Sequence, residues 1–276
     1  MTVDTSIQTD VRLCSERVVV LGASNVAMSL SRLIYSIRDV VPHDTYLKML
    51  FACGHGRSYG QYSNVLVRKL PGILNCGLWS VLEQIQRMEP TDSPYRLKAI
   101  LTDVGNDLVY GVPVPRILDW VERCLIRLKK HDADLVMTGL PVHSLSRLSP
   151  LRYTLTQKLF FPKNSSTHKM MVGWAMELNE QLERLSEKYE ADFIEEPRDW
   201  FGFDPIHFKH HQRARIWKKF CSHWDDFDVN RSSWRGHWLD MLAVWNWKPA
   251  QRWWCGKSQS ASQPCFDADR TKVYLF

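Results

Sequence analysis

The stretch that decides the fold is RVVVLGASN, residues 17–25. Its first half is a short, continuous run of β-branched and aliphatic residues, which is typical of a strand buried on both faces of a sheet. Its second half combines a glycine with helix-capping residues, and a helical pattern follows as far as Val40. The stretch therefore predicts a strand that leads directly into a helix, the first unit of a parallel α/β sheet.

The same alternation continues along the chain. Further strands are predicted at residues 46–53, 97–104, 133–140 and 191–195, and further helices at 77–88, 115–130, 169–189 and 206–220. Continuous apolar strands that alternate with helices indicate a parallel sheet covered on both faces. We therefore expect a three-layer α/β/α sandwich with a doubly wound, mainly five-stranded parallel sheet and a site at the carboxyl ends of its strands.

Composition excludes several classes of protein. The chain has 276 residues, and 45% hydrophobic with 24% charged residues is the balance of an ordinary globular protein rather than a disordered one. The start of the sequence lacks the pattern of a secretory signal, and no apolar run is long enough for a membrane helix. A net charge of +6 allows anionic partners without requiring nucleic acid. Seven scattered cysteines without C-x-x-C spacing favour reduced thiols, so we expect a cytoplasmic location and no structural zinc.

The composition divides the chain into three parts: residues 1–16 as an N-terminal extension, 17–222 as the α/β domain, and 223–276 as a tryptophan-rich C-terminal extension. Eight of the twelve tryptophans lie between residues 217 and 254, and the polar segment after Gly256 is predicted to be a loop or mobile tail. Trp234, Trp238, Leu242 and Trp245 have the spacing of one helix face. Such a face packs against the domain or a second subunit, docks a partner, or lies on a membrane interface.

Polar residues follow four of the predicted strands, and each has an ordinary structural use. Ser24 could cap a helix, Gly105-Asn106-Asp107 is common in turns, and Asp204 with Pro205 is a common helix start. Together they are more informative, because acyl transfer needs a nucleophilic hydroxyl, an imidazole base, a carboxylate that orients it and donors for the oxyanion. Ser24, His207 and Asp204 supply the first three at one rim of the sheet.

These blocks resemble those of the SGNH hydrolase superfamily, the GDSL-type esterases and lipases. The family's G-D-S block corresponds to Gly22-Ala23-Ser24, its G-R-T-like block to Gly56-Arg57-Ser58, and its G-x-N-D block, contracted, to Gly105-Asn106-Asp107. Its D-x-x-H block is Asp204-Pro205-Ile206-His207, the most specific of the four. The blocks occur in family order over residues 17–222. Ala23 is a departure, because the family has an aspartate there that helps to hold the serine loop.

The resemblance implies a flavodoxin-like SGNH fold and a serine ester hydrolase that needs neither a metal nor an organic cofactor. Ser24 would be the nucleophile, His207 the base and Asp204 the residue that orients it. The N–H groups of Ser24 and Gly56, or of Gly54 instead of Gly56, would form the oxyanion hole with the side chain of Asn106. The expected partner is a small-molecule or acylated ester.

Two alternatives stay open. Gly56-Arg57-Ser58-Tyr59-Gly60 matches G-x-S-x-G, the nucleophile elbow of α/β-hydrolases, which would make Ser58 the nucleophile. We favour Ser24, because only two strands precede Ser58 and the elbow leaves the other blocks unused. The second alternative is a non-catalytic binding or membrane-associated protein that uses its Trp/Arg-rich C-terminal region. No nucleic-acid motif is present, so nucleic acid is not an expected partner.

Four further residues at the rim are candidates for substrate contact: Asn25, Arg57, Tyr110 and His143. A metal site is also conceivable near residues 207–223, which include His207, His210, His211 and His223. None of the spacings of a zinc motif accompanies these histidines, so no metal is expected.

Overall fold

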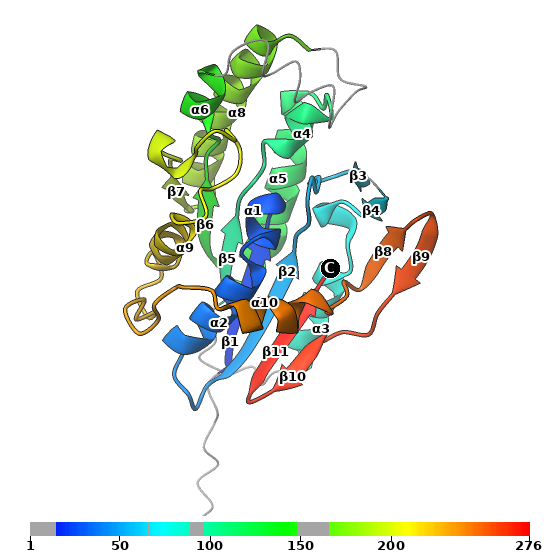
Figure 1. Ribbon diagram of the computed structural model, residues 1–276, viewed down its shortest axis with the longest axis vertical. Helices are drawn as coiled ribbons and strands as arrows, with labels where there is room; N and C mark the ends of the chain where they lie inside the picture. Colours follow the sequence, from blue (N-terminus) through cyan, green and yellow to red (C-terminus); the bar gives the residue numbers. More distant parts are fainter. Residues whose placement is uncertain (1–14, 66, 89–96, 148–165) are drawn as a thin grey trace, which may run out of the picture.

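The computed structural model describes residues 15–65, 67–88, 97–147 and 166–276. Residues 1–14 of the expected N-terminal extension lie outside this part. The central sheet has seven strands in the order β10-β11-β2-β1-β5-β6-β7 (Figure 1). Five of them are the predicted strands: β1 (Ser15–Leu21), β2 (Tyr46–Ala52), β5 (Leu97–Leu101), β6 (Asp134–Thr138) and β7 (Asp192–Ile194).

All neighbouring pairs among these five strands are parallel. The chain places β2 on one side of β1 and then places β5 on the other side. The carboxyl end of β1 is therefore a topological switch point, where the loops after adjacent strands separate and leave room for a site. The predicted fold class, an α/β sandwich on a doubly wound parallel sheet, is confirmed.

Helices cover both faces of the sheet. Val19 and Leu21 of β1 pack with α3 (Leu78–Met88), α5 (Val114–Lys129) and α8 (His168–Lys188). Val18 and Val20 point the other way, toward α2 (Leu30–Val40) and α9 (Arg213–Cys221). Successive side chains of a strand alternate between faces, so both rows of β1 are buried and the sheet is the middle of three layers.

Two predicted helices differ from the observed ones. The helix expected from residue 25 is divided into α1 (Ser24–Ala27) and α2. The helix expected from residue 206 begins only at Arg213, because the preceding loop is held by other bonds. Phe201 and Phe208 form an antiparallel bridge, and the Asp204 carboxylate accepts from backbone N–H groups within the loop.

The C-terminal segment joins the central sheet. β11 (Thr271–Leu275) runs parallel to β2, and β10 (Phe266–Ala268) runs antiparallel to β11. The polar stretch after Gly256 forms β9 (Lys257–Ser260), so the prediction of a loop or mobile tail there was wrong. β9 and β8 (Gln251–Trp254) pair with β3 (Ser63–Val65) and β4 (Arg68–Leu70) in a second, four-stranded antiparallel sheet.

The tryptophans between residues 217 and 254 differ in their exposure. Trp217, Trp224 and Trp234 are buried, as the packing interpretation predicts. Trp234 precedes α10 (Trp238–Trp245) instead of belonging to it, so the predicted helix face is wrong at that position. Trp238 and Trp245 of α10 are exposed, and the helix lies beside α2 (Figure 1).

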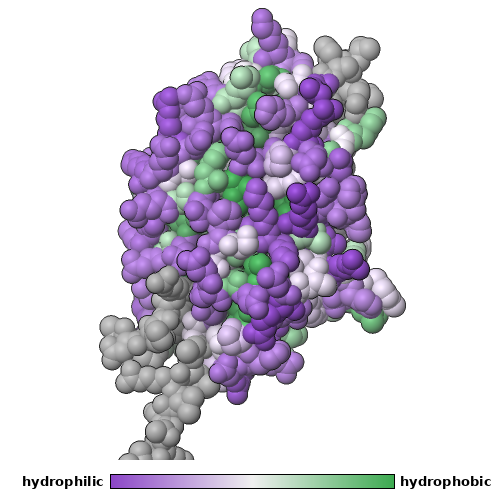
Figure 2. Space-filling model, turned by 90° about the vertical axis from the view of Figure 1, so that its left-hand side faces the viewer, coloured by the Kyte–Doolittle hydropathy of each residue, from purple (hydrophilic) through white to green (hydrophobic). Residues whose placement is uncertain are grey.

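The surface is predominantly polar on the face shown in Figure 2, where hydrophobic side chains form small, separate groups. Within the described ranges, no helix combines the length and the apolar character that crossing a bilayer requires.

Candidate active site

The structure brings together three residues from distant parts of the chain. Ser24 is the first residue of α1, directly after β1, and its Oγ lies 2.8 Å from Nε2 of His207. Nδ1 of His207 lies 2.5 Å from Oδ2 of Asp204. The side chain of Ser24 does not cap α1, because the cap position belongs to Ala23. Ser24, His207 and Asp204 therefore form a continuous hydrogen-bonded chain at the carboxyl end of the sheet.

Asp204 holds both the imidazole and its own loop. Its second oxygen, Oδ1, accepts from the backbone N–H groups of Ile206 at 3.1 Å and His207 at 3.3 Å. Burial alone would raise the pKa of Asp204, but the hydrogen bond and charge of His207, helped by these two N–H groups, lower it. The carboxylate is thus ionised at neutral pH, and it fixes the ring with Nε2 toward Ser24.

The backbone around Ser24 is held by Asp103, at the carboxyl end of β5. One oxygen, Oδ2, accepts from the N–H groups of Ala23 at 2.8 Å and Asn25 at 3.0 Å, and Oδ1 accepts from the side chain of Asn25 at 2.7 Å. Asp103 itself has a φ of 60°, an uncommon conformation for a residue with a side chain. Among the described residues, the N–H of Ser24 between these two bonded groups has no acceptor.

Asn25 connects the serine loop to the histidine loop. Its Nδ2 also donates to the carbonyl of Ile206 at 3.0 Å, and its Oδ1 accepts from the N–H of Phe208 at 2.9 Å. The side chain is buried, and its amide is used entirely by the protein. The predicted contact of Asn25 with substrate is not supported; the residue fixes the position of His207 relative to Ser24.

The glycine-rich loop after β2 presents a second backbone donor. Gly56 has a φ of 64°, and a Cβ there would lie 2.5 Å from Val65, so only glycine fits. Its carbonyl accepts from the Tyr110 hydroxyl at 2.6 Å, while no described residue accepts from its N–H. The carbonyl of Gly54 accepts from the N–H of Arg57 at 3.0 Å and closes the turn. This turn and the hydrogen bond from the Tyr110 hydroxyl to Gly56 together hold the loop in place.

Asn106 begins α4 (Asn106–Val109) after β5, as the predicted third block requires. Its Nδ2 is buried, and no described residue accepts from it. Buried amides are normally hydrogen-bonded, so an unpaired donor at this rim is suited to a ligand oxygen.

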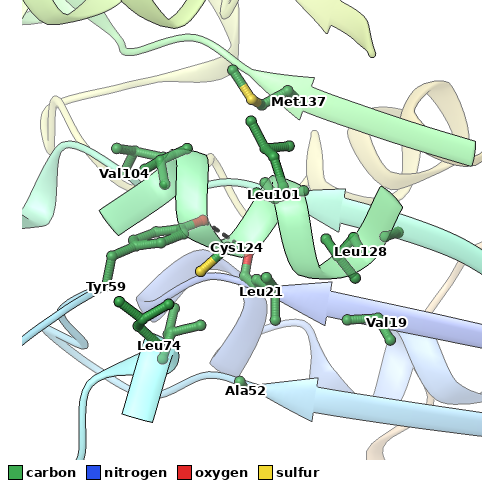
Figure 3. Close-up of a cluster of buried hydrophobic side chains, with 14 of the residues drawn as sticks. Val19, Leu21, Ala52, Tyr59, Leu74, Leu101, Val104, Cys124, Leu128 and Met137 are labelled. Atoms are coloured by element: carbon green, nitrogen blue, oxygen red, sulfur yellow. Dashed lines mark hydrogen bonds between the residues drawn. The ribbon is translucent and has the colours of Figure 1, made fainter. Parts of the chain in front are cut away.

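Ser58 has a structural role. It is fully buried, and its Oγ accepts from the N–H groups of Gly60 at 3.2 Å and Gln61 at 3.0 Å. The neighbouring Tyr59 points into the core (Figure 3), where its hydroxyl donates to the carbonyl of Thr102 at 2.9 Å. Its N–H donates to Asp107 at 2.8 Å. These bonds anchor the loop, and no histidine of the described chain contacts Ser58, as an elbow nucleophile would need.

Two other candidates lie elsewhere. Arg57 is completely buried, and its guanidinium donates to the carbonyls of Cys53 and Phe276. Among the described residues, its Nε and its second terminal nitrogen have no hydrogen-bond partner, and the complete burial of the side chain argues against contact with a substrate. His143 is exposed on α6 (Val142–Ser146), after β6.

Sequence reasoning missed two residues at the site. The sequence interpretation gives Asp103 no role, because its hydrogen bonds are with residues about 80 positions away in the chain. His55 lies in the glycine-rich loop; burial, Arg68 and His207, in that order, lower its pKa. His55 is therefore neutral at neutral pH and lies within electrostatic reach of His207.

In the described residues, no group of three or more His, Cys, Asp or Glu side chains is placed so that it could hold a metal ion. His223, the last of the four histidines in the sequence, has its Nδ1 at 3.3 Å from Oδ2 of Asp192.

Comparisons with known proteins give distant structural likenesses. No family model matches the sequence, and the search of curated proteins found no match. A solved esterase, EstA from Pseudoalteromonas, is 13% identical over 76% of this chain and 98% of its own, with a TM-score of 0.43. A lipolytic G-D-S-L family protein from Veillonella parvula is 9% identical over 76% and 98%, with a TM-score of 0.46. TesA is 11% identical over 75% and 97%, with a TM-score of 0.43. Likenesses this distant do not bear on activity, which has to be argued from the site itself.

Proposed function

We propose that this chain is a serine ester hydrolase of the SGNH type. The observation that carries the proposal is the chain of hydrogen bonds from Ser24 through His207 to Asp204, at 2.8 and 2.5 Å. An isolated serine hydroxyl is a weak nucleophile at neutral pH, and an adjacent imidazole that is itself oriented by a carboxylate is the usual means of activating it.

In the proposed reaction, Ser24 Oγ attacks the ester carbonyl while His207 Nε2 takes its proton. His207 then gives this proton to the leaving alcohol, and an acyl-Ser24 intermediate remains. Water attacks the acyl group with His207 again as base, and the acid is released. Asp204 stabilises the imidazolium that forms in both halves and keeps its Nδ1–H in place.

The proposed oxyanion hole consists of the N–H groups of Ser24 and Gly56 and the Nδ2 of Asn106. Each of the three donors lacks an acceptor among the described residues. Donors that are already in position cost no reorganisation when charge develops on the carbonyl oxygen.

The test is labelling of the purified protein with a fluorophosphonate, followed by peptide mapping of the adduct. We expect the adduct on Ser24, its loss in Ser24→Ala and His207→Ala, and its retention in Ser58→Ala, with circular dichroism confirming that each variant is folded. Asn106→Ala should lower kcat by about 10²–10³-fold, as for other oxyanion donors. An adduct on Ser58 would overturn the assignment.

The alternative is a binding protein on the same scaffold. The observation in its favour is the exposed apolar surface of α10, where Trp238 is 63% and Trp245 82% exposed. A folded sample that forms no adduct and hydrolyses no ester would favour this alternative.

A further inference from the structure

A cavity of about 460 Å³ lies at the glycine-rich loop after β2, the loop that also holds Gly56. This volume is within the range of small-molecule sites. The cavity's open lining comes from the end of α1, the start of α2, the loop after β2, β4, the end of β11, and α10 with the segment that follows it. Segments that are far apart in the sequence thus build it together, including the C-terminal segment that the family motifs do not reach.

Ser24 and His207 are not part of the lining, but residues close to both of them in the chain are. Gly54 and His55, which line it, belong to the same loop as Gly56. Met28, also in the lining, follows the short helix that Ser24 begins. Arg213 donates to the carbonyl of Phe208, the residue after His207, at 3.3 Å. His55 also interacts electrostatically with His207, and we infer that a substrate bound at Ser24 extends toward this cavity.

The polar part of the lining is cationic. Arg68, Arg213 and Arg252 all contribute to it, and no carboxylate of the described chain forms an ion pair with any of them. The guanidinium of Arg213 contacts the carbonyl and sulfur of Met28, each at 3.3 Å, and Nε of Arg252 donates to Gln259 at 2.8 Å. By contrast, Arg215 on the same helix as Arg213 pairs with Asp199 at 3.7 Å.

The three arginines are partly buried. Burial lowers the pKa of Arg68, with the charge of Arg252 adding to it, and burial also lowers the pKa of Arg213. Arginine stays protonated in proteins, so the three positive charges persist at neutral pH. Partial burial weakens the hydration of these charges, and an anionic ligand would replace the lost hydration with charge-assisted hydrogen bonds.

The rest of the lining is apolar. Phe51 and Leu275 come from the two adjacent strands, and Val244 and Trp247 come from α10 and the segment after it. The cavity thus offers guanidinium groups and an apolar wall within one space, which suits a ligand that carries an anionic group on a hydrocarbon chain.

We propose that this cavity binds the anionic group of the substrate, so that the preferred esters carry a carboxylate or phosphate on an apolar chain. The proposal rests on the proposed ester hydrolase function for its kinetic consequence. Its binding consequence is independent of catalysis and can be measured on its own.

The first experiment measures binding of octanoate, octyl phosphate and octanol to the full chain, with tryptophan fluorescence as the signal because Trp245 and Trp247 line the cavity. We expect saturable binding of at least one of the two anions and much weaker binding of octanol. Arg68→Gln and Arg252→Gln should each weaken anion binding about tenfold to a hundredfold, the effect of losing a hydrogen bond to a charged group. The matched control Arg215→Gln should bind as the wild type does. The two anions show whether carboxylate or phosphate is preferred.

The second experiment compares kcat/KM for nitrophenyl octanoate and for the nitrophenyl monoester of suberic acid, which has the same chain length and a terminal carboxylate. The ratio should favour the anionic ester by about tenfold or more. It should fall toward one in Arg68→Gln and Arg252→Gln and stay unchanged in Arg215→Gln.

Equal binding of octanol and the anions, or arginine variants that bind as the wild type does, would overturn the proposal. Ester hydrolysis at Ser24 without any anionic preference would overturn it while leaving the proposed function intact. Anion binding without a Ser24 adduct would support the site and contradict the hydrolase.

Discussion

The geometry of Ser24 depends on a carboxylate from another strand. Ala23 stands where the resembled family has an aspartate, and Asp103 accepts the N–H groups on both sides of Ser24. The half-buried Asp103 carries a raised pKa because burial outweighs the hydrogen bonds from Asn25 and Ala23. The three hydrogen bonds that it accepts hold the backbone on both sides of Ser24 and the side chain of Asn25.

Asp103→Asn should therefore impair positioning of the nucleophile. The amide would place a donor against a donor, either the Nδ2 of Asn25 or the two backbone N–H groups. We expect kcat and the rate of fluorophosphonate labelling to fall about tenfold to a hundredfold, with a smaller change in KM. The exposed Asp44→Asn serves as the control. A loss of thermal stability with an unchanged labelling rate would show that Asp103 only supports the fold.

Asp107 makes stability depend on pH. Burial raises its pKa from 3.8 to about 6, although the hydrogen bonds from Ser58 and the N–H of Tyr59 oppose the shift. Because the folded-state pKa is above the unfolded one, the contribution to stability is fully present below pH 3.8 and is lost as the pH rises through about 6.

Asp107→Asn removes this titration while keeping an oxygen for the N–H of Tyr59. The unfolding free energy of the variant minus that of the wild type should rise by up to about 3 kcal/mol as the pH increases from 3.8 to above about 6. Urea unfolding at a series of pH values measures the difference. A difference that does not change with pH would contradict the raised pKa.

The site residues that could be predicted from the sequence are those with a recognisable pattern in their immediate neighbourhood. Asp204 and His207 are three positions apart, so their pairing follows from a single loop, and Ser24 follows a strand whose pattern is unmistakable. The roles of Asp103 and Asn25 could not be predicted, because they depend on contacts with residues about 80 and 180 positions away. Asn25 and Arg57 have side chains suited to substrate, and only their burial shows that the protein itself uses them.

At the scale of elements, β11 is the largest departure from expectation. Its sequence, TKVYL, is too short to show that it pairs with β2 rather than forming a hairpin of its own. Val273 is fully buried against the helices of one face, whereas Lys272 pairs with Asp267 at the surface. The strand therefore extends the sheet beyond the five predicted strands.

Val273→Ala should lower the unfolding free energy by about 1–3 kcal/mol, because it removes buried apolar area and leaves a cavity. Lys272→Ala on the same strand should change it by less than about 1 kcal/mol, since it loses only a surface ion pair. Denaturant unfolding with the same m-value for both variants measures the effect. Equal, small effects of the two substitutions would mean that β11 contributes little to the core.

At the scale of the whole molecule, the C-terminal segment and the rest of the chain share buried interactions in three places. β11 pairs with β2, and Arg57 in the interior donates to the carbonyl of Phe276. Lys98 of β5, fully buried, bonds Glu16 at 2.8 Å and Asp226 at 2.7 Å. Removing residues 223–276 would leave β2 with an unpaired edge and Lys98 with one partner fewer.

These shared contacts predict that residues 15–222 and 223–276 unfold together. Eight of the twelve tryptophans lie between residues 217 and 254, so fluorescence reports mainly on the C-terminal part, while α3, α5 and α8 dominate the circular dichroism. The two signals should give coincident urea transitions, which is the test of a single cooperative unit. Addition of octyl phosphate or octanoate should shift both curves equally to higher urea, because a ligand bound between the two parts stabilises both. A fluorescence transition at lower urea than the dichroism transition would instead identify the C-terminal segment as a separately folding extension.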